Sequence, residues 1–199
     1  MKEVSWNQAR EAFVIESQAI TNALGRIEKE AFGSAVDVLK KAERIGASGC
    51  GHSGIACRHF AHLMCCIEKP ARFISPSEAI HGGMGFFKQG DALLWVSRGG
   101  KTAELVPILD IAHRKGIVII GITENPDSPL AQNSDILLFM AIERETDKHN
   151  SQGTASFCVA NAIFDALQAA LIEETEFHNE QFAFIHPGGA VGERLNKKS

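Results

Sequence analysis

Short apolar runs alternate with helical segments from residue 45 onward, and this alternation limits the possible folds more than any other feature of the chain. Many residues of these runs are β-branched, and the runs show no regular exchange of polar and apolar residues. Such runs are typical of parallel strands that are buried on both faces. The sequence therefore predicts an α/β protein with a parallel sheet. Its strands are expected at residues 45–49, 71–74, 92–96, 117–122 and 136–140.

Apolar residues at helical spacing occupy the segments around these strands. Helices are expected at residues 5–31, 33–44, 53–67, 102–114 and 153–174, followed by a short polar tail. No repeat or linker interrupts the pattern. The 199 residues are therefore expected to form one domain, with N-terminal helices over about 5–44 and an α/β core over about 45–195.

Composition and charge restrict the partners and the location of the protein. A net charge of −4 gives no overall attraction to nucleic acid or to an anionic membrane, so an anionic ligand must be held by local groups. The N-terminus lacks the apolar core of a signal peptide, and no apolar run approaches the length of about 18 residues that a membrane span requires. Cys57, Cys65 and Cys158 lie in apolar helical stretches, which favours buried thiols in a reducing compartment. A cytoplasmic protein without nucleic-acid or membrane partners is expected.

The turn after the first predicted strand reads Gly49-Cys50-Gly51-His52-Ser53-Gly54 and matches the pattern G-x-G-x-x-G. Glycines allow a ligand to approach the backbone, and the N-terminus of the following helix offers free N–H groups to an anion. A dinucleotide-binding fold would also need an acidic residue at the end of the next strand, and residues 73–76 contain none. A nicotinamide-dependent oxidoreductase is therefore an alternative that rests on this motif alone.

The turn after the third predicted strand reads Ser97-Arg98-Gly99-Gly100-Lys101-Thr102. It combines two hydroxyls, two cations and a pair of glycines ahead of a helix, which is the equipment of a phosphate-binding turn. The alternative is that Thr102 caps the helix and that Arg98 and Lys101 are solvated. Because ligands of parallel sheets bind at the carboxyl ends of the strands, we expect this turn and the first one to form one anion site.

Further candidates lie in three loops. His81 and His186 stand beside glycines, where a ligand can approach an imidazole, and Glu143 and Glu145 follow the last predicted strand. The alternative for each is an ordinary surface residue. No spacing of histidines indicates a dedicated metal site.

Taken together, these motifs resemble the SIS (sugar isomerase) domain family, most closely the bacterial D-arabinose 5-phosphate isomerases. The resemblance covers about residues 30–195. It rests on motifs in family order at 51–54, 76–82, 90–91, 97–102, 125–128, 153–156 and 186–189. It implies a five-stranded parallel sheet flanked by helices on both faces, a three-layer arrangement like that of flavodoxin or the Rossmann fold, with a sugar phosphate at the strand ends. Members often carry a tandem pair of CBS domains after this point, which this chain is expected to lack.

The resemblance also implies roles for individual residues. The phosphate-binding hydroxyls of the family fall on Ser53, Ser97 and Thr102, its functional histidines on His81 and His186, and its acid on Glu145. It further implies a homotetramer whose active sites combine residues of neighbouring subunits, and no cofactor.

The reaction that the resemblance implies is aldose–ketose isomerisation through a cis-enediol. This reaction needs a base at carbon, an acid/base for the two oxygens and an anchored phosphate. Glu145 or His186 is the candidate base, and His81 is the candidate for ring opening or for the oxygen protons.

The sequence departs from the family motifs at four positions. His52 replaces the usual lysine, Gly99 and Lys101 replace a serine and a glutamate, and Gly153 replaces a proline. Lys101 is expected to supply a cation to the phosphate anchor, and His52, Arg98 and Gly99 are further candidates for substrate binding. The same departures favour an alternative function, a non-catalytic sensor or regulatory module that binds a sugar phosphate.

Overall fold

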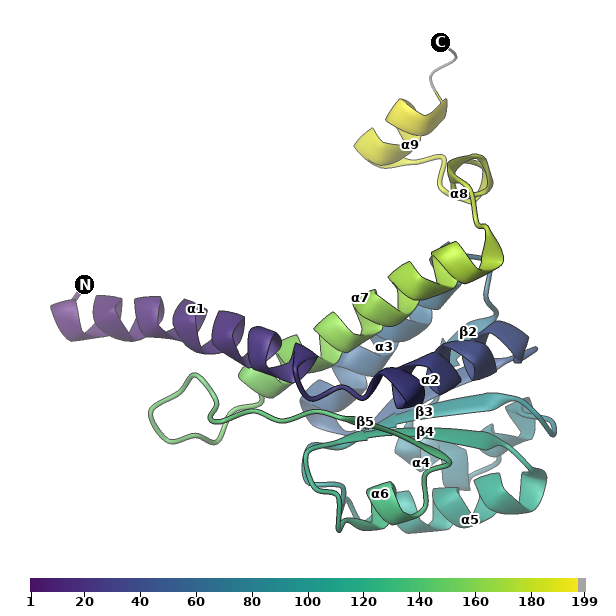
Figure 1. The fold of residues 1–199 in the computed structure, drawn as a ribbon, viewed down its shortest axis with the longest axis horizontal. Helices are drawn as coiled ribbons and strands as arrows, with labels where there is room; N and C mark the ends of the chain where they lie inside the picture. The colour runs from purple at the N-terminus through teal and green to yellow at the C-terminus, as the bar shows by residue number, and fades with distance from the viewer. Residues whose placement is uncertain (197–199) are drawn as a thin grey trace.

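Five parallel strands form one sheet in the computed structural model, which describes residues 1–196. They are β1 (Ile45–Gly49), β2 (Ala71–Phe73), β3 (Ala92–Val96), β4 (Val118–Thr123) and β5 (Ile136–Phe139), in the order β2-β1-β3-β4-β5 (Figure 1). The predicted five-stranded parallel sheet is confirmed, with each strand within one residue of its expected bounds. The last three residues of the domain predicted over 1–199 lie outside the described residues.

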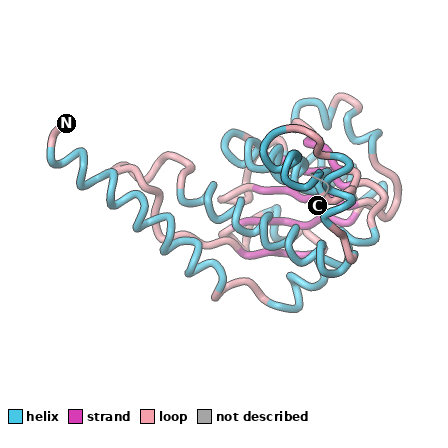
Figure 2. The backbone as a smooth tube through the Cα atoms, turned by 90° about the horizontal axis from the view of Figure 1, so that it is seen from above, coloured by secondary structure: helices cyan, strands magenta, loops and turns pink. Residues whose placement is uncertain are grey.

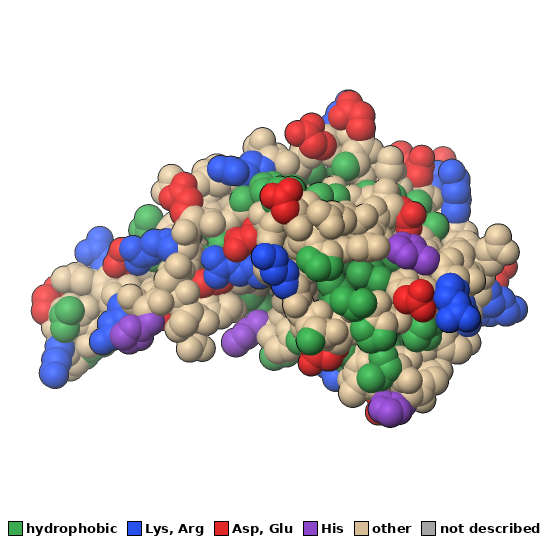
Figure 3. Space-filling model, turned by 90° about the horizontal axis from the view of Figure 1, so that it is seen from below, with side chains coloured by type: hydrophobic (Ala, Val, Ile, Leu, Met, Phe, Trp, Pro, Cys, Tyr) green, Lys and Arg blue, Asp and Glu red, His purple; other side chains and the backbone are tan. Residues whose placement is uncertain are grey.

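Helices cover both faces of the sheet, as predicted. One layer contains α1 (Glu3–Leu24), α2 (Lys29–Lys41), α3 (Gly51–Cys66) and α7 (Ala155–Thr175). The other contains α4 (Pro76–Ile80), the 3-10 helix η1 (Gly83–Phe86), α5 (Leu105–Lys115) and α6 (Pro129–Gln132). Figure 3 views the molecule from the side of α5 and shows hydrophobic side chains gathered between charged ones on this face.

The strand β3 explains why both layers form. Its five residues are all buried, and successive side chains point to opposite faces. Leu94 packs in the core under α3 and α7, whereas Leu93 and Trp95 pack in the core under α5. A strand that is apolar on both faces is stable only when helices cover both faces. The continuous apolar run at residues 92–96 therefore indicates a strand that lies between two layers of helices.

The layout of the connections creates a crevice at the carboxyl ends of β1 and β3. These two strands are neighbours, with Gly49 paired to Val96. The chain leaves β1 into α3 on one face and leaves β3 into α5 on the other. Neighbouring strands whose helices depart to opposite faces form a topological switch point, where ligands of such sheets bind.

Several expected helix bounds were wrong. The helix expected over 5–31 ends at Leu24, and α2 begins at Lys29. The expected polar tail contains two helices instead, α8 (Asn179–Ile185) and α9 (Gly189–Asn196). Phe182 of α8 lines a pocket together with Ile67 and Ile172, at the far ends of α3 and α7. Such a contact between distant segments leaves no long periodic signal in the sequence.

Helix α7 alone among the described residues is long and apolar enough to cross a membrane by length and composition. The expectation that no apolar stretch approaches the length of a membrane span was therefore wrong for α7. In the structure α7 packs against α1, α2 and α3, and Val159, Phe164 and Leu167 are buried in the core. Its apolar character is therefore accounted for by the packing of the domain.

The cysteines only partly follow the expectation of buried thiols. Cys57 is buried, Cys158 is half-buried and Cys65 is exposed, so the expectation was wrong for Cys65. Burial raises the pKa of Cys158 to about 11 and raises the pKa of Cys57 as well. Both of these thiols therefore stay protonated near neutral pH.

Helix α1 projects away from the rest of the molecule (Figures 1 and 2). Only Ala19 and Ala23 of this helix are buried. Val4, Trp6, Phe13, Val14, Ile20 and Leu24 are all at least 40% exposed. An apolar helix with so little of its own chain to pack against leaves a large hydrophobic surface uncovered.

Helix α3 lies so close to β1 that Gly54 cannot carry a side chain. A Cβ at this position would lie 2.5 Å from the carbonyl oxygen of Gly49. We expect Gly54→Ala to lower the free energy of unfolding by about 1–3 kcal/mol, because α3 must move off the sheet. Gly33→Ala in α2 is the matched control, since a Cβ there meets nothing within 4 Å and should leave stability equal or raised. Urea unfolding of both variants measures this, and equal stabilities would contradict the close packing.

Candidate active site

The first predicted turn brings Ser53 to the end of β3. A Cβ on Gly49 would lie 2.9 Å from the carbonyl oxygen of Val96 and 3.1 Å from the Cβ of Ser53. The two groups therefore face the same small space, which only a glycine leaves open. Gly51 adopts a φ of 56°, a left-handed conformation that lets the chain turn directly into α3. Ser53 is half-buried in the first turn of that helix, where backbone N–H groups are free to bind an anion.

The second predicted turn folds around a pair of hydroxyls. Ser97 Oγ and Thr102 Oγ1 are 2.9 Å apart, and the backbone N–H of Gly100 donates to Ser97 Oγ. Gly100 has a φ of 64°, and a Cβ there would collide with the side chain of Ser128. The alternative role of Thr102 as a helix cap was wrong, because α5 begins at Leu105. Lys101 and Gly99 are exposed at the rim of this turn.

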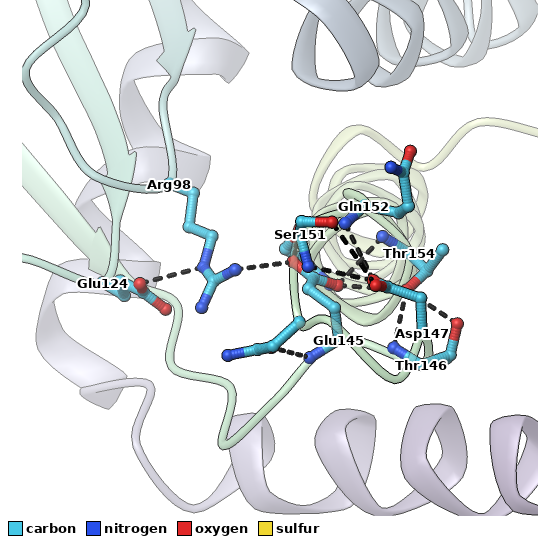
Figure 4. A network of polar contacts seen from close by, with 10 residues as sticks. Arg98, Glu124, Glu145, Thr146, Asp147, Ser151, Gln152 and Thr154 are labelled. Atoms are coloured by element: carbon cyan, nitrogen blue, oxygen red, sulfur yellow. Dashed lines mark hydrogen bonds and ion pairs between the residues drawn. The ribbon is translucent and has the colours of Figure 1, made fainter.

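Arg98 links the second turn to two acidic residues (Figure 4). Its Nε donates to Glu124 Oε1 and its Nη1 donates to Glu145 Oε1, both at 2.9 Å. The side chain of Glu145 is 1% exposed and that of Arg98 is 33% exposed. The alternative of a solvated Arg98 was therefore wrong. Sequence reasoning did not pair these residues, because they lie in three separate loops.

The carboxylate of Glu145 is also bound by the start of α7. Oε2 accepts hydrogen bonds from the backbone N–H groups of Thr154 and Ser156 and from the Thr154 hydroxyl, and Oε1 accepts one from the Ser156 hydroxyl at 2.6 Å. With Arg98 this makes five donors, which occupy the lone pairs that a carboxylate offers. The positive end of the α7 dipole stabilises the same buried charge.

Asp147 organises the loop between Glu145 and α7. Its carboxylate accepts hydrogen bonds from the backbone N–H groups of Gln152, Ser151 and His149. These bonds, that from Gln152 first, lower the pKa of Asp147, so the loop keeps its anionic centre well below neutral pH. The segment that carries Glu145 is thus held by its own hydrogen bonds.

A cavity of about 420 Å³ borders the first turn. Its polar wall includes Arg58, Ser75 and Glu104, and Cys50 lies beside the glycines of the turn. Burial, followed by the charge of Glu104, raises the pKa of Cys50, so this thiol is a poor nucleophile. Ser53, Ser97 and Thr102 are not among the residues that line it, so the cavity lies beside the glycines of the first turn and not over these three hydroxyls.

The three predicted histidines lie in different places. His52 is exposed at the second residue of α3, and His81 is exposed at the end of α4. Among residues 1–196, neither imidazole forms a hydrogen bond with Ser53, Ser97 or Thr102, although His52 belongs to the first turn. The fold therefore does not by itself join His81 to the hydroxyls of the two turns.

His186 lies at the opposite end of the domain from Ser53. It follows Phe182 by one helical turn, and the two rings are 4.9 Å apart. Phe182 packs beside Cys66, the last residue of α3, whereas Ser53 is in the first turn of that helix. The 16 residues of α3 span about 24 Å, so His186 cannot reach the hydroxyls of its own chain in this conformation.

Metal binding has no support in the geometry of the described residues. Within residues 1–196, no three side chains of His, Cys, Asp or Glu are grouped to hold a metal ion. The expectation that no cofactor takes part stays a prediction.

A doubly wound parallel sheet with glycine-rich, hydroxyl-bearing turns at its switch point is the arrangement of phosphate-binding α/β proteins. The sequence profile described as "SIS domain" matches residues 38–172. The chain belongs to the SIS domain family, as its motifs indicated.

Curated relatives are named as arabinose 5-phosphate isomerases. KdsD of Pseudomonas aeruginosa is 35% identical over 189 residues, which are 95% of this chain and 58% of that protein. KpsF of Escherichia coli is 32% identical over 187 residues, 94% of this chain and 57% of that protein. The chain thus spans less than three-fifths of the length of these relatives.

Solved structures share the fold closely. A candidate sugar-phosphate isomerase of Listeria monocytogenes is 35% identical with a TM-score of 0.91, over 94% of this chain and 100% of that one. A protein of E. coli in complex with arabinose 5-phosphate has a TM-score of 0.86 over 94% of this chain and 100% of that one, and at 24% identity it supports the fold alone.

The buried charge of Glu145 gives a test of the network. We expect Glu145→Gln to lower the free energy of unfolding by about 2–3 kcal/mol, because the amide presents a donor to groups that already donate, and Arg98 keeps only Glu124. Glu143→Gln, in the same loop but exposed, is the control and should cost less than about 0.5 kcal/mol. Chemical unfolding of both variants measures this. An unchanged free energy of unfolding in Glu145→Gln would mean that the network does not stabilise the fold.

Proposed function

We propose that this protein is an aldose–ketose isomerase of sugar phosphates, of the arabinose 5-phosphate isomerase type. The observation that carries this proposal is the contact of Ser97 Oγ with Thr102 Oγ1 at 2.9 Å in the turn after β3, with Ser53 in the turn after the neighbouring strand β1. Three hydroxyls and the free N–H groups of α3 suit a phosphate monoester, and Lys101 at the rim adds a cation. The names of the relatives support the choice of substrate class.

The proposed mechanism moves two protons within the substrate. A base takes the proton from C1 of the ketose and returns it to C2, while a second group gives a proton to the oxygen at C2 and takes one from the oxygen at C1. The anchored phosphate fixes the sugar so that these transfers occur within one complex. Because five donors already hold Glu145, we assign the transfer at carbon to His186 and a positioning role to Glu145. His81 is left for ring opening or for the oxygen protons.

This assignment requires a homo-oligomer with shared sites, a tetramer by resemblance. His186 is too far from Ser53 in one chain, so it must come from a neighbouring subunit. The exposed apolar side chains of α1 suit burial between subunits, as do Phe184 and Ile185 of α8, which are 84% and 41% exposed. A buried ring nitrogen of His186, Nδ1, lacks a partner among the described residues, which fits a histidine that acts in an assembled site.

The remaining expectations from the sequence are part of the same proposal. The enzyme would work in the cytoplasm without a cofactor, and would bind neither nucleic acid nor membranes. The slightly negative net charge favours this, because an overall attraction to polyanions is missing.

A non-catalytic sugar-phosphate sensor is the second candidate. His52, Gly99 and Lys101 change the chemistry of the two turns relative to the family motifs. The fold also occurs in the NanR protein of Vibrio vulnificus complexed with ManNAc-6P, which is 23% identical with a TM-score of 0.78. Fold alone therefore does not separate the two functions.

A test of turnover distinguishes the isomerase from the sensor. We expect D-arabinose 5-phosphate or a related pentose or hexose phosphate to raise the melting temperature, since a ligand that binds only the folded state stabilises it. The best binder should then be converted between its aldose and ketose forms, which NMR of the sugar follows directly. The unphosphorylated sugar is the control and should give no shift. Stabilisation without turnover of any sugar phosphate would favour the sensor.

Sharing of the site can be tested by complementation. We expect His186→Ala and Thr102→Val each to lose most turnover, about a hundredfold or more. When the two are co-expressed with different tags and the mixed oligomers are purified, about a quarter of the sites should combine intact halves and regain activity. Mixed oligomers no more active than either parent would mean that each chain supplies its own His186.

A further inference from the structure

His52 and Gly153, two of the four departures from the family motifs, lie against each other. A Cβ on Gly153 would be 3.3 Å from Cβ, Cγ and Nδ1 of His52. Contacts this short require the His52 side chain to shift by a few tenths of an ångström, and the ring of a proline would add more atoms in the same space. Gly153 therefore leaves the room that the imidazole of His52 occupies.

The His52 ring is fixed on a second side by Phe157. The ring centroids are 6.4 Å apart and the planes meet at 77°, an edge-to-face arrangement. Phe157 lies in the first turn of α7, and Thr154, next to Gly153, binds the carboxylate of Glu145. His52 thus bridges the turn that carries Ser53 and the loop that carries Glu145, two segments about a hundred residues apart in the chain.

The imidazole stays open to a ligand. His52 is exposed, and no hydrogen bond to its ring occurs within the described part of the chain, residues 1–196. The His52 atoms nearest to a Cβ on Gly153 are Cβ, Cγ and Nδ1, so Nε2 is the ring nitrogen farther from Gly153. An imidazole can give a proton and take one, whereas the ammonium of a lysine at this position could only donate.

We propose that His52, positioned by Gly153, is the group that carries the oxygen protons of the sugar, which leaves ring opening to His81. In the ketose-to-aldose direction His52 gives a proton to the oxygen at C2 and takes one from the hydroxyl at C1, so it ends in the state in which it began. This inference rests on the proposed isomerase function. It is preferred over His81 because His52 precedes Ser53 directly, while His81 is attached to the layer of α5.

The test is a double-mutant cycle of His52→Ala and Gly153→Ala, followed on the sugar phosphate that turns over best. We expect Gly153→Ala to lower kcat about tenfold with less than a twofold change in KM, because it displaces the ring but not the phosphate anchor. In the His52→Ala background the same glycine change should alter kcat less than about twofold.

Two further variants separate chemistry from structure. His52→Gln keeps a hydrogen-bond donor but cannot carry a proton, so KM should be kept while kcat falls about a hundredfold. Gly85→Ala, where a Cβ meets nothing within 4 Å, is the matched glycine control and should match the unmodified enzyme. Equal losses from Gly153→Ala in both backgrounds, or full kcat in His52→Gln, would overturn the proposal.

The cycle also works if the isomerase function itself fails. Should no sugar phosphate turn over, the four proteins are compared by their Kd for D-arabinose 5-phosphate. Coupling of about fivefold or more between the two substitutions would keep His52 as a ligand-binding group held by Gly153 and discard only its proton-transfer role. Additive effects on Kd would discard both.

Discussion

The site depends on the ion pair between Arg98 and the buried carboxylate of Glu145. A charge in the interior is tolerated only when it is paired and hydrogen-bonded, and here Arg98 and the N-terminus of α7 supply that compensation. The same contacts connect the turn after β3, which carries Arg98, to the loop after β5, which carries Glu145. The loops after β3, β4 and β5 are therefore held together by Arg98, Glu124 and Glu145. These contacts fix the positions of the loops before any ligand binds.

Close backbone packing is the complementary constraint. Gly49 and Gly54 let α3 lie directly on the sheet, so Ser53 reaches the end of β3, and Gly100 lets the second turn pass over Ser128. The hydroxyls of Ser97 and Thr102 form a hydrogen bond within this turn, ahead of the first residue of α5. The arrangement of the two turns depends on the absence of side chains at a few positions as much as on the polar groups that remain.

In the proposed function a single chain is an incomplete unit. Ser53 and His186 lie at opposite ends of α3, and apolar side chains of α1 and α8 are exposed. The exposed apolar surface would be costly in an isolated monomer, and association of subunits would cover it and would bring His186 of one copy to Ser53 of another. Assembly and activity are therefore coupled in the proposed function, because the groups that anchor the sugar and the group that moves its proton would come from different copies.

The sequence by itself determined the sheet, the helical layers and the positions of the two glycine-rich turns, because buried strands, glycines and hydroxyls are local signals. It did not reveal the pairing of Arg98 with Glu124 and Glu145, the contact between His52 and Gly153, or the helices α8 and α9. Each of these depends on residues far apart in the chain that the strand order β2-β1-β3-β4-β5 brings together. Local pattern decides which elements form, and only their three-dimensional packing decides which side chains meet.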